Sequence, residues 1–130
     1  MTPELLVDAR ATLGECVLWC EQRATLYWTD IEGATLSEGR GTTRPLELFG
    51  APDIDARAVM AEMERLAPQW LAGCTLREIW FEPTFHKHLG QLCHGVQIHA
   101  EGGFYGQEAF RPWRLQALAF KAIRRLTPDY

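Results

Sequence analysis

Residues 112–126 read PWRLQALAFKAIRRL, and this stretch decides the fold class because it is the clearest helix of the chain. Pro112 suits a first helical turn, and Arg124 and Arg125 lie at the C-terminal end, where the helix dipole favours cations. The apolar residues recur at helical spacing: Leu115, Leu118, Ala119, Ala122, Ile123 and Leu126. A helix with one apolar stripe needs a second layer to bury it.

The segments before this helix predict that layer. Three of them favour extended structure: residues 46–52, 76–83 and 92–100. Residues 54–67 predict a second helix with one apolar stripe, with Asp53 or Asp55 as its N-cap and Pro68 at its end. The order strand, helix, strand, strand, helix indicates an α+β fold, a small mixed sheet with two main helices on one face.

The N-terminal part differs in character and predicts a β-hairpin. Residues 15–19 and 25–31 are rich in β-branched and aromatic side chains, and a turn at 20–23 separates them. A lone hairpin is marginal in water and needs a partner surface. We therefore expect two parts, a hairpin appendage at 1–36 and an α+β domain at 37–130.

Composition narrows the functional classes. The 130 residues carry a net charge of −4, which argues against nucleic acid as a partner because phosphate binding needs a basic face. No run of about 18 apolar residues exists, so we expect no membrane span. The first residues, MTPE, do not resemble a secretory signal, so we expect a cytoplasmic protein. Four cysteines are too few for a disulfide scaffold, and reduced thiols are expected.

Residues 37–45, SEGRGTTRP, form the first candidate binding segment. They hold two glycines, one carboxylate, two guanidinium groups and three hydroxyls. Glycine lets a backbone approach a ligand closely, and arginine offers a planar fork for carboxylate or phosphate. A polar loop ended by a proline turn is the alternative interpretation. The candidate substrate-binding side chains are Glu38, Arg40, Thr42 and Arg44, and Glu38 either orients an arginine or acts as an acid or base.

Residues 81–99 form the second candidate segment and contain all four histidines of the chain. The candidate ligand contacts here are Thr84, His86, Lys87 and His99. A polar turn between two strands is one alternative. A zinc site is another, from this set: His86, His88, Cys93, His94 and His99. Their spacing matches no standard zinc motif, so we expect no metal and no cofactor. A glycosidase-like pair of Glu38 with Glu82 is also open, because the sequence does not give their separation.

Several linked motifs resemble the C-terminal domain of the NamZ-type exo-β-N-acetylmuramidases, a family long catalogued as a domain of unknown function. The resemblance covers residues from about 36 to 130. The motifs are LSEGRGTTRP at 36–45, ELFGAP at 47–52, F-x-P-T-F-x-K-H-x-G-x-x-C-x-G-V-Q-I-H at 81–99 and FRP at 110–112.

This resemblance implies a glycoside hydrolase family that removes terminal N-acetylmuramic acid from peptidoglycan fragments, in cell wall recycling. In those enzymes a larger Rossmann-like domain precedes this one and is expected to hold the catalytic carboxylate. The chain is therefore expected to be incomplete as an enzyme, with its catalytic residue unknown and Glu38 as a candidate. Both segments would help to form the cleft between domains, where Arg40, Arg44 or Lys87 suits the lactyl carboxylate of muramic acid.

Residues 8–36 resemble a different family, the first hairpin of the gluconolactonase and senescence-marker-protein β-propellers. The matching residues are ATLGE at 11–15, Trp19 and TLYWTDIEG at 25–33. The glutamate that corresponds to Glu15 is a divalent-metal ligand in that family, but Cys16 and Val17 replace its usual Gly-Pro. About 26 residues cannot close a propeller ring. The resemblance implies a truncated propeller hairpin fused near residue 36.

Three functions follow from the sequence. The first is a muramidase-family domain that is inactive alone. The second is a non-catalytic module that binds muramyl sugars or a partner protein, and the third is a relic of a metal-dependent lactonase. The expected partners are a muramic-acid-containing sugar and either a second copy of the chain or a separate catalytic chain. A large exposed apolar patch would mark the face for such a protein partner.

Overall fold

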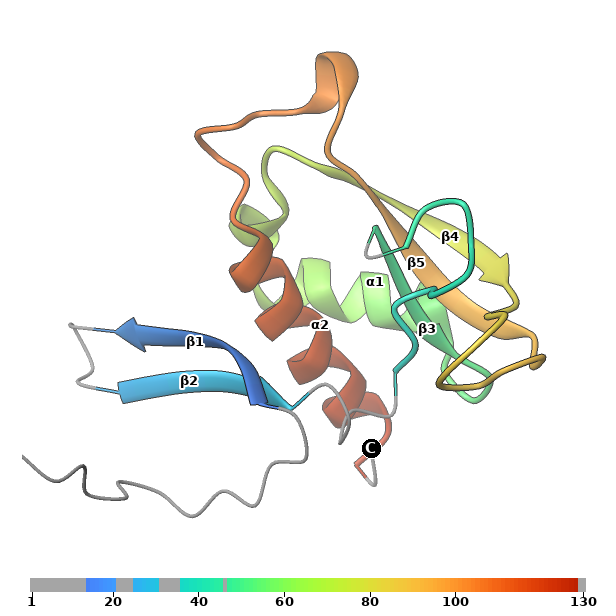
Figure 1. The fold of residues 1–130 in the computed structure, drawn as a ribbon. Coiled ribbons are helices and arrows are strands. Elements are labelled where there is room, and N and C mark those ends of the chain that lie inside the picture. The colour runs from blue at the N-terminus through green and yellow to red at the C-terminus, as the bar shows by residue number, and fades with distance from the viewer. Residues whose placement is uncertain (1–13, 21–24, 31–35, 46, 129–130) are drawn as a thin grey trace, which may run out of the picture. The chain divides into compact units, whose positions relative to one another are not determined.

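The computed structural model describes residues 14–20, 25–30, 36–45 and 47–128, which fall into two compact units (Figure 1). The first unit, Met1–Ala34, contains a two-stranded antiparallel hairpin of β1 (Gly14–Cys20) and β2 (Thr25–Asp30). The predicted hairpin is therefore confirmed, although most of its predicted turn lies outside the described residues. Glu15, whose counterpart binds a metal in the propeller family but for which no such role is expected here, is not tested, because the side chains of these strands are also outside the description.

The second unit, Thr35–Tyr130, has the predicted α+β fold. Its elements are β3 (Leu48–Ala51), α1 (Ala56–Leu66), the short 3-10 helix η2 (Pro68–Leu71), β4 (Thr75–Phe81), β5 (Cys93–His99), the 3-10 turn η3 (Gly102–Phe104) and α2 (Pro112–Leu126). The three strands form one sheet in the order β3-β5-β4. The sheet is antiparallel throughout and not mixed, because both edge strands pair antiparallel with the central β5.

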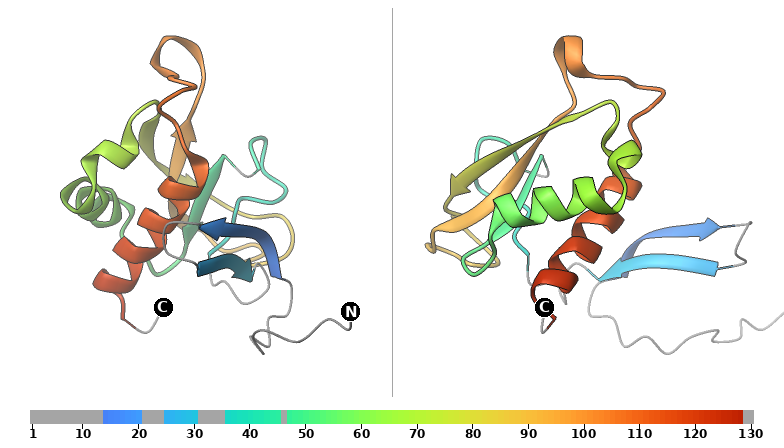
Figure 2. Two further views of the ribbon diagram at one scale, coloured as in Figure 1. Left: turned by 90° about the vertical axis from the view of Figure 1, so that its left-hand side faces the viewer. Right: turned by 180° about the vertical axis from the view of Figure 1, so that it is seen from behind.

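Both helices lie on one face of this sheet (Figures 1 and 2). The carboxylate of Asp55 caps α1 by accepting hydrogen bonds from the backbone N–H groups of Arg57 (2.9 Å) and Ala58 (3.1 Å). Leu126 is 46% exposed, against expectation, because α2 ends there. The apolar stripes of both helices pack together with neighbouring residues to form the main core. Its buried residues are Leu36, Ala51, Ile54, Val59, Met63, Ala67, Leu115, Leu118, Ala119, Ala122 and Ile123. No helix in the described ranges is long and apolar enough to cross a bilayer.

The opposite face of the sheet carries a smaller core, formed by Leu48, Phe81 and Cys93. Gly50 and Gly95 pair across the sheet here, and a Cβ on either would come within 2.8 Å of the Phe81 ring. Both positions therefore need glycine to leave room for this ring. This face positions the candidate site, because the loop at residues 36–45 packs on it through Leu48.

Candidate functional site

The loop at residues 37–45 is anchored to the sheet edge and folded tightly on itself. Ser37 and Gly50 exchange backbone hydrogen bonds of 2.8 and 3.0 Å, which attaches the loop to β3. The Thr42 amide (3.0 Å) and hydroxyl (2.6 Å) both donate to the carbonyl of Gly39. Gly39 and Gly41 have φ angles of +71° and +81°, a region that favours glycine. The hydroxyl proton of Thr42 thus serves the turn, and its predicted contact with substrate stays a prediction.

This loop touches the segment that follows β4. The Thr84 amide donates to the carbonyl of Arg40 at 3.3 Å. Gly41 lies so close to Thr84 that an added Cβ would overlap the Thr84 hydroxyl and stand 3.0 Å from Cδ1 of Phe85. The structure therefore brings together the two candidate segments that are about 40 residues apart in the sequence, and Gly41 makes their close approach possible.

The second segment has a strained backbone. His86 and His88 have φ angles of 65° and 57°, which are uncommon for residues other than glycine. The Gly90 amide donates to the carbonyl of Pro83 at 2.9 Å and closes this loop. The imidazole of His86 is exposed and lies 5.2 Å, centre to centre, from the ring of Phe85. Local strain of this kind is often found where a side chain is held for a ligand.

Glu38, Arg40 and Lys87 give the junction its charge. The Arg40 Nε–H donates to the Glu38 carboxylate. Burial acts to raise the pKa of Glu38, but the Arg40 hydrogen bond, a backbone hydrogen bond and the positive charges of Lys87 and Arg40 together outweigh burial and lower this pKa. A general acid needs a raised pKa, so Glu38 suits an acceptor that orients Arg40 better than a proton donor. We call Glu38, Arg40, Gly41, Thr84 and Lys87 the two-loop site.

Arg44 and His99 belong to a neighbouring cluster around Glu101. The Arg44 guanidinium pairs with Glu47 at 2.9 Å and with Glu101 at 3.0 Å. His99 Nδ1 lies 3.7 Å from the same Glu101 carboxylate, and its buried Nε2 has no hydrogen-bond partner among the described residues. Two carboxylates engage Arg44, whereas the ion pair of Arg40 is with the single carboxylate of Glu38.

The zinc alternative finds no ligand set. His94 and His99 point to opposite faces of β5, because side chains alternate along a strand. No three His, Cys, Asp or Glu side chains lie together as a metal ion requires in the part of the chain that the structure describes. Burial, with the charge of Asp53, raises the pKa of the Cys93 thiol. The separation of Glu38 from the exposed Glu82 is not established, so that pair stays a prediction.

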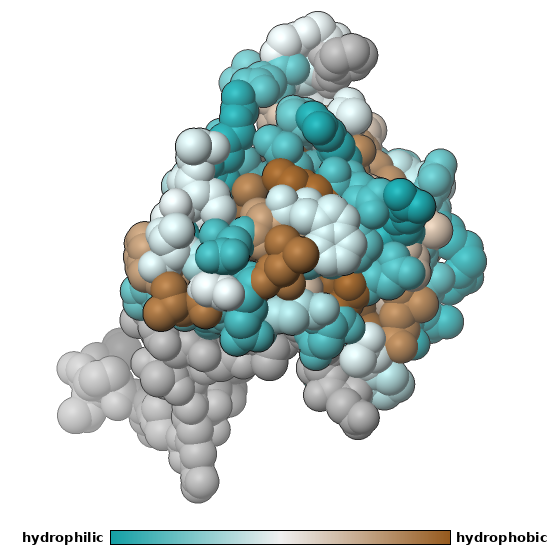
Figure 3. All heavy atoms as spheres, turned by 90° about the vertical axis from the view of Figure 1, so that its right-hand side faces the viewer, coloured by the Kyte–Doolittle hydropathy of each residue, from teal (hydrophilic) through white to brown (hydrophobic). Residues whose placement is uncertain are grey.

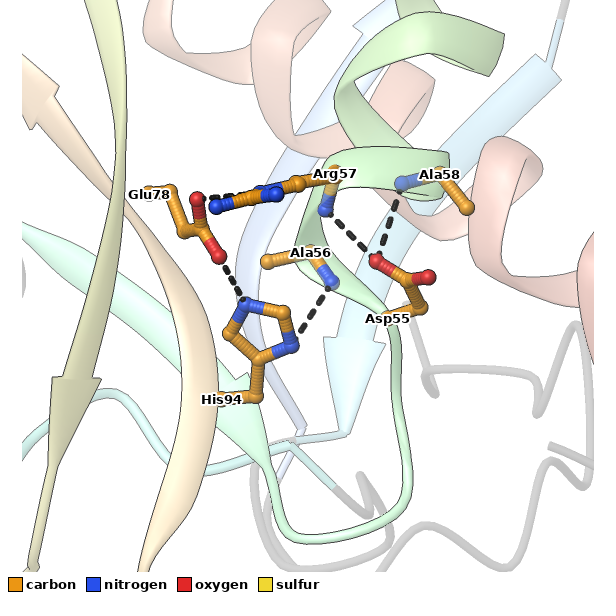
Figure 4. A network of polar contacts seen from close by, with 6 residues as sticks. All are labelled: Asp55, Ala56, Arg57, Ala58, Glu78 and His94. Carbon is orange, nitrogen blue, oxygen red and sulfur yellow. Dashed lines mark hydrogen bonds and ion pairs between the residues drawn. The ribbon is translucent and has the colours of Figure 1, made fainter.

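A polar cluster on the helix face was missed by the sequence reasoning (Figure 4). His94 Nε2 lies 2.8 Å from Glu78 Oε1, and His94 Nδ1 accepts the Ala56 amide at 3.3 Å. The Arg57 Nε–H donates to the other oxygen of Glu78 at 2.6 Å. The Trp80 indole stacks flat on the His94 ring, with 4.1 Å between centres and 6° between planes. Alternation along β4 puts Glu78 and Trp80 on one side, but only strand pairing brings His94 to them.

Comparisons with known proteins agree with these motifs. A family model described as Exo-beta-N-acetylmuramidase NamZ, C-terminal, matches residues 29–130. The peptidoglycan beta-N-acetylmuramidase NamZ of Bacillus subtilis (strain 168) is 40% identical over 99 residues, which are 76% of this chain and 22% of that protein. The L-arabinolactonase of Azospirillum brasilense is 45% identical over 49 residues, which are 38% of this chain and 16% of that protein.

A solved structure shares the fold. The crystal structure of a DUF1343 family protein from Bacteroides fragilis superimposes with a TM-score of 0.63 and 23% identity, over 75% of this chain and 24% of that chain. The chain therefore spans about a fifth of the length of the curated relatives it matches. The muramidase-family resemblance is confirmed, and the lactonase match lends some support to the second resemblance.

Proposed function

The chain belongs to the family of the C-terminal domain of exo-β-N-acetylmuramidase NamZ, and from this we propose that its Thr35–Tyr130 unit binds a muramic-acid-containing sugar of peptidoglycan at the two-loop site. The observation that carries the proposal is the junction of two loops, where Arg40 and Lys87 act on one partly buried carboxylate. The lactyl group of muramic acid is a carboxylate, and a guanidinium with an ammonium beside it suits that group.

The remaining groups of the junction suit the neutral part of such a sugar. Thr84 and His86 are exposed on the strained segment beside Arg40 and offer a hydroxyl and an imidazole. A glutamate is ordinarily ionised at neutral pH, and the lowered pKa of Glu38 favours the same form, so its carboxylate can accept a hydrogen bond from a sugar hydroxyl. The site therefore combines a charged contact for the lactyl group with polar contacts for the ring.

We assign recognition to these residues, and hydrolysis to groups outside the two-loop site. Glycoside hydrolysis ordinarily uses two carboxyl groups, one of which must be protonated to assist the leaving group. Glu38 is held as a carboxylate by Arg40, which opposes that role. A second copy or a separate catalytic chain is a source of the missing groups, and in that case this domain would position the sugar.

The test combines ligand-observed NMR with a hydrolysis assay on the purified chain. We expect saturation transfer to N-acetylmuramic acid, and no release of the chromophore from its chromogenic glycoside. Arg40→Ala should weaken binding roughly tenfold, as expected for the loss of one charge-assisted contact. Arg124→Ala removes the same charge from the exposed end of α2 and should leave binding unchanged.

Two results would contradict this proposal. Equal binding by the wild type and Arg40→Ala would exclude the two-loop site as the acid-binding site. Turnover by the wild type that is lost in Glu38→Gln would show a self-sufficient hydrolase, with Glu38 as a catalytic residue. Failure of the wild type to bind the sugar would reject the proposal for the isolated chain.

A further inference from the structure

We propose that Trp80 and the polar groups beside it form a second carbohydrate site, which takes an uncharged pyranose unit of a glycan. The Trp80 side chain is 56% exposed, which is unusual for an indole. It lines an open depression next to the N-terminus of α1, together with Pro52, Asp53, Arg57 and His94. The two-loop site does not use these residues. This second proposal rests on the proposed function only in that both take sugars as the class of ligand.

The indole is held rigidly. One of its faces lies flat on the His94 ring, with 4.1 Å between ring centres. The Ala56 amide donates to Nδ1 of His94, so the proton of the neutral ring lies on Nε2 and is donated to Glu78 (Figure 4). Arg57 fixes Glu78 in turn. Because this chain of contacts fixes the imidazole plane, the free face of the indole is preorganised and a ligand need not order it.

The composition of the depression fits a sugar ring. A pyranose has a face of C–H groups that stacks on an aromatic plane, and a rim of hydroxyls that need polar partners, so an aromatic platform with a polar rim binds it well. Asp53, Glu78 and Arg57 supply carboxylate acceptors and a guanidinium donor around Trp80. Carboxylates outnumber the guanidinium there, which opposes an acidic sugar such as muramic acid and favours an uncharged one.

The position of Trp80 separates this platform from the two-loop site. Trp80 and Glu78 project from the side of β4 that faces α1, whereas Phe81 projects to the smaller core under the two loops. On the side of the domain where β4 ends, hydrophobic residues form separate patches among hydrophilic ones (Figure 3). The two sites therefore lie on opposite faces of one sheet, and a glycan unit at one leaves the other accessible.

The test uses triacetylchitotriose, an uncharged N-acetylated sugar chain, titrated into the full chain. NMR is recorded on protein with labelled tryptophan. We expect the Trp80 indole signal to shift and binding to weaken roughly tenfold in Trp80→Ala. Trp113→Ala is the matched control, because Trp113 is 47% exposed and does not line this depression. Equal binding by the Trp80→Ala variant, or an unchanged Trp80 signal in the wild type, would overturn the proposal.

Two further samples keep the result decisive. Trp80→Phe retains a flat ring and should retain part of the affinity. It replaces Trp80→Ala in the test if that variant fails to fold. Arg40→Ala should bind triacetylchitotriose as the wild type does, while its binding of N-acetylmuramic acid weakens roughly tenfold. If the wild type binds triacetylchitotriose but not N-acetylmuramic acid, the proposal for the two-loop site fails. If it binds N-acetylmuramic acid but not triacetylchitotriose, the proposal for the Trp80 platform fails.

Discussion

The close approach of the two loops predicts a specific effect of Gly41→Ala. The added Cβ would overlap the Thr84 hydroxyl, and φ at this position is +81°. Gly90 offers a matched control, because its φ is +68° and a Cβ there would meet nothing within 4 Å. Gly90→Ala therefore carries the conformational cost alone, and Gly41→Ala carries that cost together with a steric one.

The magnitudes follow from these two costs. A left-handed φ costs a non-glycine residue roughly 1–2 kcal/mol. Forcing extra atoms into a packed contact typically costs about 1–3 kcal/mol more. We expect the free energy of unfolding to fall by about 1–2 kcal/mol in Gly90→Ala and by about 2–5 kcal/mol in Gly41→Ala. Urea unfolding followed by tryptophan fluorescence measures both, with an unchanged m-value as the sign of a pure stability effect.

A second substitution isolates the contact. Thr84→Gly removes the hydroxyl and Cβ that the new methyl would strike, so it should restore most of the steric part when it is combined with Gly41→Ala. Equal losses of stability in Gly41→Ala and Gly90→Ala, within about 0.5 kcal/mol, would refute the reasoning, because the loop contact would then contribute nothing. The same result would remove the structural basis for the two-loop site.

Two further predictions concern the helices. Glu62 of α1 pairs with Arg65 and with Arg125 of α2; these hydrogen bonds, led by that of Arg65, lower its pKa from 4.5 to about 2 against the effect of burial. The resulting stabilisation is complete above about pH 4.5 and is lost as the pH falls toward 2, so Glu62→Gln should flatten the acid limb of the stability profile. Met63 is fully buried between the helices and the sheet, so Met63→Ala should cost about 2–5 kcal/mol in urea unfolding, whereas the exposed Glu64→Ala should cost under about 0.5 kcal/mol.

Local sequence signals were sufficient for the two α-helices and three strands of the α+β unit, although not for its 3-10 helices η2 and η3. The periodicity of residues 112–126 and the proline that opens this stretch predict α2 with its observed bounds, because an amphipathic stripe and a proline act within one segment. Of the two predicted caps, Asp53 and Asp55, the structure shows Asp55, which lies close enough in the chain to accept from the first amides of α1. The relative direction of the strands was harder to predict from the sequence. A mixed sheet was expected, and only the pairing of both edge strands with β5 makes it antiparallel.

Only part of the site could be predicted from the sequence, for a related reason. Both candidate segments were visible from their residue types, but their contact depends on the packing of both loops at one end of the sheet, and no local pattern encodes that packing. The Glu78 and His94 pair shows this limit more clearly. Strands β4 and β5 each contribute one polar residue to an apolar surface, Glu78 and His94, and either residue alone resembles an ordinary strand residue. Only the register that places Trp80 opposite His94 reveals the cluster.

The unequal covering of the two sheet faces explains why the two-loop site lies where it does. The helix face has a large apolar core, whereas among the described residues the buried cluster on the loop face consists of Leu48, Phe81 and Cys93. So small a core contributes little to holding the loops, and the positive φ angles of His86 and His88 each cost of order 1–3 kcal/mol. The loops must therefore be held by local contacts, chiefly the close packing at Gly39 and Gly41, backbone hydrogen bonds and the ion pairs of Arg40 and Arg44. A ligand that bridges the loops adds to these same contacts, so sugar binding and loop stability should rise and fall together.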